Sequence, residues 1–271
     1  MSIRVGFIGC GNMGGALAIA ASHSKNSMPV DIYLADAFTE KAKQLAETIG
    51  KCQVADNEMI AQTCDYIFLG VKPQMMRNML QTIAPILQKR LDRFVLVTMA
   101  AGLSMETVRE MAGQKYPIIR LMPNTPVLVG KGMILVTSSE VTEEEKQQFF
   151  AVMQEAGNFD EIPESLIDAG SAVSGCGPAF VYQFIEALAD GAVACGVPRD
   201  KAIEYAAQTL SGAAEMVLQT KKHPGELKDA VCSPAGSTIQ GVRTLEAHAF
   251  RGGVLEAVIA AYEKTKELGK K

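Results

Sequence analysis

The 271-residue sequence lacks long apolar runs, because no stretch approaches the ~18 apolar residues that a membrane-spanning helix needs. It also lacks a recognisable secretion signal. Residues 3–8 already have the composition of a strand, with no basic n-region or apolar h-region before them. We therefore expect no membrane partner and a cytoplasmic location.

Metal-binding and disulfide patterns are missing as well. No CxxC pair, Cys/His cluster, HExxH motif or EF-hand loop occurs, so we expect no metal site. The histidines His23, His223 and His248 stand in polar stretches without the neighbours of a catalytic triad. The six cysteines are widely spaced and are expected to be small buried side chains in a reducing compartment: Cys10, Cys52, Cys64, Cys176, Cys195 and Cys232.

An excess of basic charge is the third absence. The formal net charge is −4 and the isoelectric point is near 5.5, so we expect no nucleic-acid partner. With 48% hydrophobic and 21% charged residues, the chain belongs to neither the disordered nor the collagen-like class. Its length allows one large domain or two.

Two kinds of segment alternate in the first half of the chain. Short β-branched runs are expected as strands at residues 5–8, 30–34, 66–71, 94–98, 118–122 and 133–136. Between them, helical spacing occurs at residues 14–21, 39–49, 57–63, 77–88 and 104–112. Strict alternation predicts an α/β fold with a Rossmann-type, doubly wound parallel sheet covered on both faces.

The texture changes after Pro163, where strand candidates stop and Ala-rich helical patterns continue to the end. We expect a dinucleotide-binding domain at residues 1–162 and an all-α substrate-binding and dimerisation domain at residues 163–271. Several of the later helices are apolar or Ala/Gly-rich on more than one face, whereas a surface helix keeps a polar side. The pattern therefore predicts a homodimer or higher oligomer formed through this half.

A glycine-rich segment, Gly9-Cys10-Gly11-Asn12-Met13-Gly14, follows the first predicted strand and begins the first helix. Gly9 permits a tight turn, Gly11 lets the backbone approach a diphosphate, and Gly14 allows the helix to pack closely on the strand. The position of the motif between strand and helix predicts a dinucleotide site at Gly9, Gly11, Asn12, Met13 and Gly14.

Asp36 ends the second predicted strand, where an acidic residue binds the ribose 2′-hydroxyl of NAD. Neither Ala37 nor Phe38 supplies the arginine that NADP usually requires, although Lys41 and Lys43 could reach a 2′-phosphate. Alternatively, Asp36 is only a turn or capping residue. Both NADH and NADPH therefore stay open as cofactors.

Residues just past the other strands are expected to line the rest of the cofactor site, since ligands bind at the carboxyl ends of such sheets. Lys72 places a charge near the ribose or is an exposed structural lysine. Asn124 either contacts nicotinamide or braces its proline-rich loop. The candidates are Val71, Lys72, Pro73, Ala100 and Asn124.

A second anion site is predicted where a turn cluster at residues 232–237 runs into a helical pattern. The first N–H groups of a helix lack intrahelical partners, so Gly236, Ser237 and Thr238 can present amides and hydroxyls to a small carboxylate. The alternative is an ordinary Ser/Thr N-cap.

Five segments together resemble the pyrroline-5-carboxylate reductase family, in order and over essentially the whole chain. They are the glycine loop, Val-Lys-Pro at 71–73, Arg-Leu-Met-Pro-Asn-Thr-Pro at 120–126, Ala-Val-Ser-Gly-Cys-Gly-Pro-Ala at 172–179, and Ser-Pro-Ala-Gly-Ser-Thr at 233–238. The resemblance implies reduction of the cyclic imine 1-pyrroline-5-carboxylate to L-proline by NADPH or NADH.

The resemblance also implies residue roles. Asn57 matches an adenosine-side asparagine, Ser233 to Thr238 match the loop for the substrate carboxylate, and Thr238 matches a threonine near the substrate nitrogen. Two departures stand out, because the family commonly has Gly where this chain has Ala235 and Ser where it has Cys176. Ala235 strains the backbone if that position needs positive φ, and the thiol of Cys176 is a poorer donor than a hydroxyl.

Two other functions remain open at the level of sequence. A β-hydroxyacid dehydrogenase-like reductase of similar architecture would use a helical-half lysine for proton transfer, yet none of the candidates stands in a glycine-rich helix entrance: Lys201, Lys221, Lys222 and Lys228. A non-catalytic NAD(P)-binding sensor would bind the dinucleotide without turnover.

Overall fold

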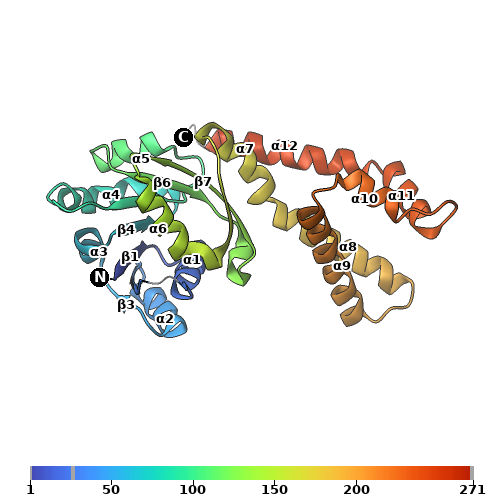
Figure 1. The fold of residues 1–271 in the computed structure, drawn as a ribbon, viewed down its shortest axis with the longest axis horizontal. Helices are drawn as coiled ribbons and strands as arrows, with labels where there is room; N and C mark the ends of the chain where they lie inside the picture. The colour runs from blue at the N-terminus through green and yellow to red at the C-terminus, as the bar shows by residue number, and fades with distance from the viewer. Residues whose placement is uncertain (1, 26–27, 269–271) are drawn as a thin grey trace. The chain divides into compact units, whose positions relative to one another are not determined.

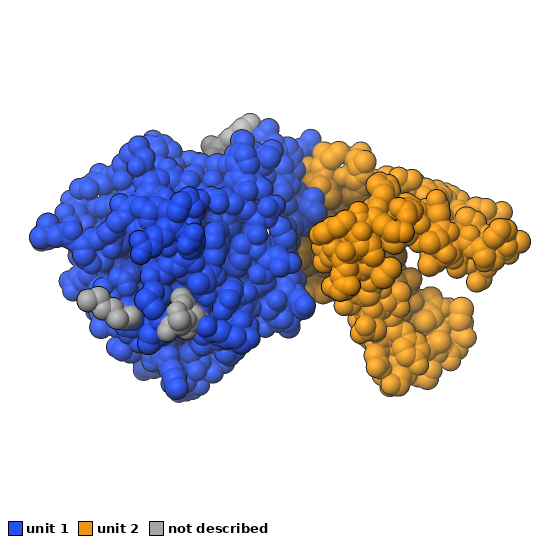
Figure 2. Space-filling model, in the orientation of Figure 1, with its two compact units in different colours: residues 1–176, 261–271 blue, residues 177–260 orange. Residues whose placement is uncertain are grey.

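The computed structural model describes residues 2–25 and 28–268. The chain divides into two compact units (Figure 2). The sheet unit comprises Met1–Cys176 and Ala261–Lys271, and the helical unit comprises Gly177–Ala260. Within the described residues, no helix is both long and apolar enough to cross a membrane.

One eight-stranded sheet forms the centre of the sheet unit, in the order β3-β2-β1-β4-β5-β6-β7-β8 (Figure 1). The chain moves outward from β1 to β3 and then returns to place β4 on the other side of β1, so Val5 pairs with both Ile32 and Tyr66. This reversal is the switch point of a doubly wound sheet, where ligands bind. The strands are β1 Ile3–Ile8, β2 Val30–Ala35, β3 Gln53–Val54, β4 Tyr66–Leu69, β5 Val95–Thr98, β6 Ile118–Met122, β7 Gly132–Ser139 and β8 Gly157–Glu161.

Helices cover both faces of this sheet, as the alternating pattern predicts. Strand residues such as Phe7 and Phe68, whose rings stack with centroids 4.3 Å apart, form one core with α1 Asn12–Ser22, α2 Thr39–Ile49 and α6 Glu143–Met153. The opposite core contains strand residues such as Ile67 and Leu96 and belongs to α3 Asn57–Thr63, α4 Pro73–Leu87 and α5 Met105–Ala112. The predicted Rossmann-type sheet with a helical second half is confirmed.

The expectation of a wholly parallel sheet is wrong at β7, which runs antiparallel to β6. The connection between these strands holds only the 3₁₀ turn η1 Thr125–Val129. A parallel crossover needs a dozen or more residues, so this short link returns the chain in the opposite direction. The structure also adds two strands that were not predicted, the two-residue β3 and the largely polar β8.

All secondary structure described after residue 163 is helical: α7 Glu164–Ser174, α8 Gly177–Ala194, α9 Arg199–Thr220, α10 Pro224–Ala230, α11 Ser237–Ala247 and α12 Phe250–Leu268. Within the helical unit, α8 and α9 meet through the small buried side chains Ala189, Ala202 and Ala206. Many larger apolar side chains of this unit stay exposed, among them Val181, Tyr182, Ile203, Tyr205 and Leu255. Such surface is typical of a face that another subunit covers.

Helix α7 is fastened to the sheet by a buried arginine. Arg120 of β6 contacts the carboxylates of Glu164 at 3.1 Å and Asp168 at 2.8 Å, with its own side chain 4% exposed. Glu164 also accepts the N–H of Met105 at 2.7 Å, which satisfies a free donor in the first turn of α5. The Arg-Leu-Met-Pro segment therefore fixes where the helical half of the chain begins.

Candidate active site

The glycine loop joins β1 to α1 and has little steric freedom. Gly9 has φ +106°, and a Cβ there would lie 2.6 Å from the carbonyl carbon of Gly70. A Cβ on Gly14 would lie 2.1 Å from the Gly9 oxygen, so both positions require glycine. A Cβ on Gly11, by contrast, meets nothing within 4 Å. The space beside Gly11 is where a ligand can reach the backbone.

Helix α1 begins at this loop without a side-chain cap. Its N-cap is Gly11, and no acidic residue stands in the first turn. The leading N–H groups of a helix have no intrahelical partner, and the helix dipole adds partial positive charge there. The loop therefore fits the diphosphate of a dinucleotide.

Asp36 holds this loop in place from the end of β2. One carboxylate oxygen accepts the N–H of Cys10 at 2.8 Å, and the other accepts the N–H of Phe38 at 2.9 Å. Burial, followed by the charge of Asp36, raises the pKa of the Cys10 thiol to about 12. The thiol therefore stays neutral at physiological pH, close to its only described partner, the Ala35 carbonyl, at 3.5 Å.

A cavity of about 500 Å³ lies beside the loop. Six predicted cofactor residues line it: Gly9, Gly11, Asp36, Asn57, Val71 and Lys72. The prediction missed the lining face of α4, formed by Gln74, Met75, Asn78, Met79 and Thr82. Residues 74, 78 and 82 recur every four positions, a spacing that could have identified this face.

The other predicted cofactor residues lie outside the lining of this cavity. Asn12, Met13 and Gly14 form the first turn of α1, and Pro73 begins α4. Ala100, two residues after β5, is 2% exposed as a whole residue and belongs to the core, with its N–H donating to the Thr98 hydroxyl at 3.4 Å. Cofactor contacts of these residues stay predictions.

Asn124 is 7% exposed and takes the bracing role that was one of the two expectations. Its amide nitrogen donates to the Ser174 carbonyl at 2.8 Å, and its oxygen accepts the N–H of Met133 at 3.0 Å. These bonds tie the start of η1 to the end of α7 and to β7. A contact with nicotinamide has one amide hydrogen and one lone pair of the side-chain oxygen left to use.

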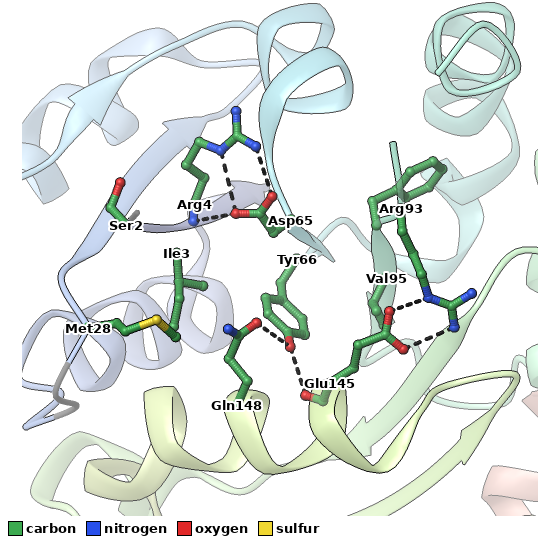
Figure 3. A pocket seen from close by; sticks show the side chains of 11 residues that line it. Ser2, Ile3, Arg4, Met28, Asp65, Tyr66, Arg93, Val95, Glu145 and Gln148 are labelled. Atoms are coloured by element: carbon green, nitrogen blue, oxygen red, sulfur yellow. Dashed lines mark hydrogen bonds and ion pairs between the residues drawn. The ribbon is translucent and has the colours of Figure 1, made fainter. Parts of the chain in front are cut away.

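A second cavity, of about 630 Å³, lies at the opposite, amino edge of β1, β4 and β5 (Figure 3). Its charged groups pair with one another: Arg4 with Asp65 at 2.9 Å, and Arg93 with Glu145. The Tyr66 hydroxyl donates to the Glu145 carbonyl at 2.7 Å, and burial raises the pKa of this phenol. Because ligands of doubly wound sheets bind at the carboxyl edge, the cavity beside the glycine loop is the candidate site.

The predicted carboxylate loop lies in the helical unit, immediately before α11. Ser233 accepts the N–H of Gly236 at 3.0 Å, closing a turn with Pro234 and Ala235 at its centre. A Cβ on Gly236 would lie 2.3 Å from the Ser233 hydroxyl oxygen, so glycine lets that hydroxyl approach the backbone. Gly236 is the N-cap of α11, and again no side chain caps the helix.

Ser237 and Thr238 form the exposed first turn of α11. Within the described part of the chain, neither hydroxyl has a hydrogen-bond partner, so both are available to a ligand. Ala235 has φ +57°. The position therefore has the positive φ that favours glycine, and alanine is strained there. The turn nevertheless forms, as the bond between Ser233 and Gly236 shows.

Cys176 stands in the short turn between α7 and α8. Its backbone N–H donates to the Ser171 carbonyl at 3.2 Å, and its side chain is half-buried. The turn thus relies on the backbone rather than on the side chain at this position.

The order of the sheet, the glycine loop and the cavity at the carboxyl edge define the class as a protein with a dinucleotide-binding fold. Family models match residues 4–102 as "NADP oxidoreductase coenzyme F420-dependent" and residues 164–268 as "Pyrroline-5-carboxylate reductase dimerisation". The chain is 41% identical to the pyrroline-5-carboxylate reductase of Escherichia coli K12, over 100% of both chains, and 39% identical to that of Glycine max, over 98% and 96%.

Solved structures agree. The crystal structure of Plasmodium falciparum pyrroline carboxylate reductase with NADP bound has a TM-score of 0.84 at 34% identity, with 98% of each chain covered. The chain belongs to the pyrroline-5-carboxylate reductase family, which confirms the resemblance drawn from its motifs.

Proposed function

We propose that this chain reduces 1-pyrroline-5-carboxylate to L-proline, the last step of proline biosynthesis, with NADH or NADPH as the reductant. The observation that carries the proposal is full-length similarity at 41% identity to a reductase of that name. The glycine loop and the Ser-Pro-Ala-Gly-Ser-Thr loop both lie within that match. A nicotinamide supplies the hydride when it is bound.

The two halves of the chain divide the work in this proposal. Residues 1–162 bind the dinucleotide, with the diphosphate at Gly11 and the α1 N-terminus, and the adenosine side near Asp36 and Asn57. Residues 163–271 bind the imino acid and form the dimer. The uncapped start of α11 and the exposed apolar side chains of the helical unit support these assignments.

The carboxylate of the substrate is expected at the beginning of α11. The amide groups of Ser237 and Thr238 suit an anion there, whereas the Gly236 N–H, also expected to bind it, already donates to the Ser233 carbonyl at 3.0 Å. The Ser233 hydroxyl lies against the Gly236 backbone. We assign the Thr238 hydroxyl, which has no partner in the described part of the chain, to accept a hydrogen bond from the protonated ring nitrogen.

The chemistry requires little acid–base help from the protein. A protonated imine is already electrophilic at carbon, so it accepts hydride without a strong general acid. The contribution of the chain is mainly to hold the reacting atoms near 3–3.5 Å apart, which is worth several kcal/mol. This agrees with a predicted site that has a threonine hydroxyl where a dehydrogenase would have a histidine or lysine.

A β-hydroxyacid dehydrogenase-like reaction is less well supported, because the lysines it would need are committed elsewhere. Lys201, Lys222 and Lys228 form exposed ion pairs with Glu204, Glu226 and Asp229, at 2.9, 2.8 and 2.7 Å. Lys221 ends α9 in a left-handed conformation. None of the four stands in the first turn of a helix beside glycine.

Thr238→Ala tests the proposal. We expect kcat/KM for the imine to fall by roughly one to three orders of magnitude, the scale of losing one positioned hydrogen-bonding group. Affinity for NADH and NADPH stays unchanged. Thr244→Ala is the matched control, since Thr244 lies on the same helix and its hydroxyl, among the described residues, donates to the Gln240 carbonyl at 3.0 Å.

Equal kinetics in wild type and Thr238→Ala remove Thr238 from the mechanism. Cofactor binding without any oxidation by the imine shows a sensor instead of an enzyme.

A homodimer or higher oligomer and a cytoplasmic location are part of the proposal. Light scattering that gives a monomer at micromolar concentration contradicts the former.

A further inference from the structure

Asp36 lies in the lining of the cavity beside the glycine loop. Its carboxylate is fixed at the lining by two backbone donors, the Cys10 N–H at 2.8 Å and the Phe38 N–H at 2.9 Å. No lysine or arginine among the described residues forms an ion pair with it. Each oxygen keeps a further lone pair, so the group can accept a hydroxyl proton but can donate none.

The cations near this carboxylate are turned to other partners. Lys43 pairs with Glu40 at 3.7 Å. Lys41 lines the cavity, and its ammonium lies over the Phe38 ring, 5.3 Å from the centroid. Lys72 also lines the cavity, but it follows β4, two strands away from β2, a backbone separation of about 10 Å. The described lining contains no arginine.

The two cofactors differ only by a phosphate on the adenosine ribose. The 2′-hydroxyl of NADH can donate to a lone pair of Asp36. The 2′-phosphate of NADPH brings up to two negative charges to the same carboxylate, and like charges at short range oppose binding. To accept NADPH, the site would have to draw Lys41 away from the Phe38 ring.

We propose that this chain is an NADH-preferring enzyme and that Asp36 is the residue that sets the preference. The inference rests on the proposed function for its physiological meaning. The binding preference itself concerns the cavity alone. The exposed Phe38 ring, at 70% exposure in the lining, offers an apolar face on which an adenine of either cofactor can stack, so it does not distinguish them.

Equilibrium titration of the full chain with NADH and with NADPH, followed by nicotinamide fluorescence without imine, tests this. We expect NADH to bind at least tenfold more tightly. Asp36→Asn should lower the ratio of the NADPH to the NADH dissociation constant at least tenfold, through tighter binding of NADPH. Glu40→Gln removes the same charge from the neighbouring helix turn, outside the lining, and should leave the ratio within twofold. Lys41→Gln should weaken NADPH alone.

In the titrations, three results overturn the inference: wild type binding NADPH as tightly as NADH, Asp36→Asn weakening both cofactors equally, or Glu40→Gln shifting the ratio of the two dissociation constants as much as Asp36→Asn. The second result would mean that Asp36 only braces the loop. If Asp36→Asn fails to fold, titration of the wild type at rising salt concentration still tests the inference. Salt screens the repulsion between Asp36 and the 2′-phosphate, so it must bring the NADPH and NADH dissociation constants closer together. An imine assay with both cofactors separates the two claims. No turnover with either contradicts the proposed function alone, and turnover that favours NADPH contradicts the preference alone.

Discussion

Two substitutions in the glycine motif distinguish a glycine that is required for packing from a glycine that is required for ligand binding. Gly14→Ala places a methyl 2.1 Å from the Gly9 oxygen, and about 0.9 Å of movement is needed to reach even a 3.0 Å contact. Overpacking of this kind costs about 1–3 kcal/mol. Because the atom that must move belongs to the loop itself, we expect Gly14→Ala to lower both the free energy of unfolding and the affinity for NADH.

Gly11→Ala should behave differently. Its new methyl meets no atom within 4 Å, and its backbone angles of φ −71° and ψ −174° are open to alanine. Loss of chain entropy in the unfolded state favours the variant by about 0.4–1 kcal/mol. The methyl nevertheless occupies the space that a diphosphate needs beside the backbone. We therefore expect unchanged or slightly higher stability, together with NADH binding at least tenfold weaker, or about 1.4 kcal/mol.

Urea denaturation by circular dichroism gives the stability of each variant, and fluorescence titration gives the dissociation constant. The critical observation is the behaviour of Gly11→Ala. If it binds NADH as wild type does, no ligand approaches the Gly11 backbone and the assignment of the diphosphate to this loop is wrong. A Gly14→Ala variant as stable as wild type would refute the steric reasoning.

Two further predictions concern buried groups. Arg120→Met leaves Glu164 and Asp168 without their cation and should lower the free energy of unfolding by about 3 kcal/mol in urea denaturation. Adding Glu164→Gln and Asp168→Asn should restore most of the lost stability. An Arg120→Met variant within about 1 kcal/mol of wild type, on the order of measurement error, contradicts the role of Arg120. With its pKa raised to about 12 from 9.0, the Cys10 thiol carries a thousandfold less thiolate at pH 8, roughly, so iodoacetamide followed by mass spectrometry should label exposed Cys195 far faster. Because the unfolded thiol ionises first, the same shift lowers stability as the pH rises from 9 toward 12. Equal labelling of the two cysteines would show that Cys10 is not shielded.

Periodicity alone predicted the parts of the fold whose signal is local. Helices α2 and α3 have the expected bounds, because helical spacing and turn residues at both ends specify them. The direction of β7 was missed, since a strand looks the same in either orientation and only the length of the preceding link decides. The polar strand β8 carries no apolar alternation to detect.

The candidate site shows the same division. Gly9 and Gly14 were identified because the glycine motif specifies a local backbone conformation in which these two positions have no room for a side chain. The α4 face beside the cavity was missed because its side chains matter only through tertiary placement. Asn124 looked equally suited to a ligand or to a brace, and only the bonds to Ser174 and Met133 favour the brace.

The two proposed anion sites hold their helix beginnings by different means, and this affects how each tolerates change. At the glycine loop, backbone packs on backbone, so Gly9 and Gly14 leave no room for a methyl. Before α11, Ala235 already takes a left-handed conformation that costs about 1–2 kcal/mol relative to glycine, and the bond from Gly236 to Ser233 still closes the turn. Strain at the exposed turn is offset locally by that bond and by the fixed φ of Pro234. A clash between buried backbones has no comparable local interaction to offset it. The departure at Ala235 is therefore compatible with a preformed carboxylate site, while an equivalent methyl at Gly14 is not compatible with the diphosphate site.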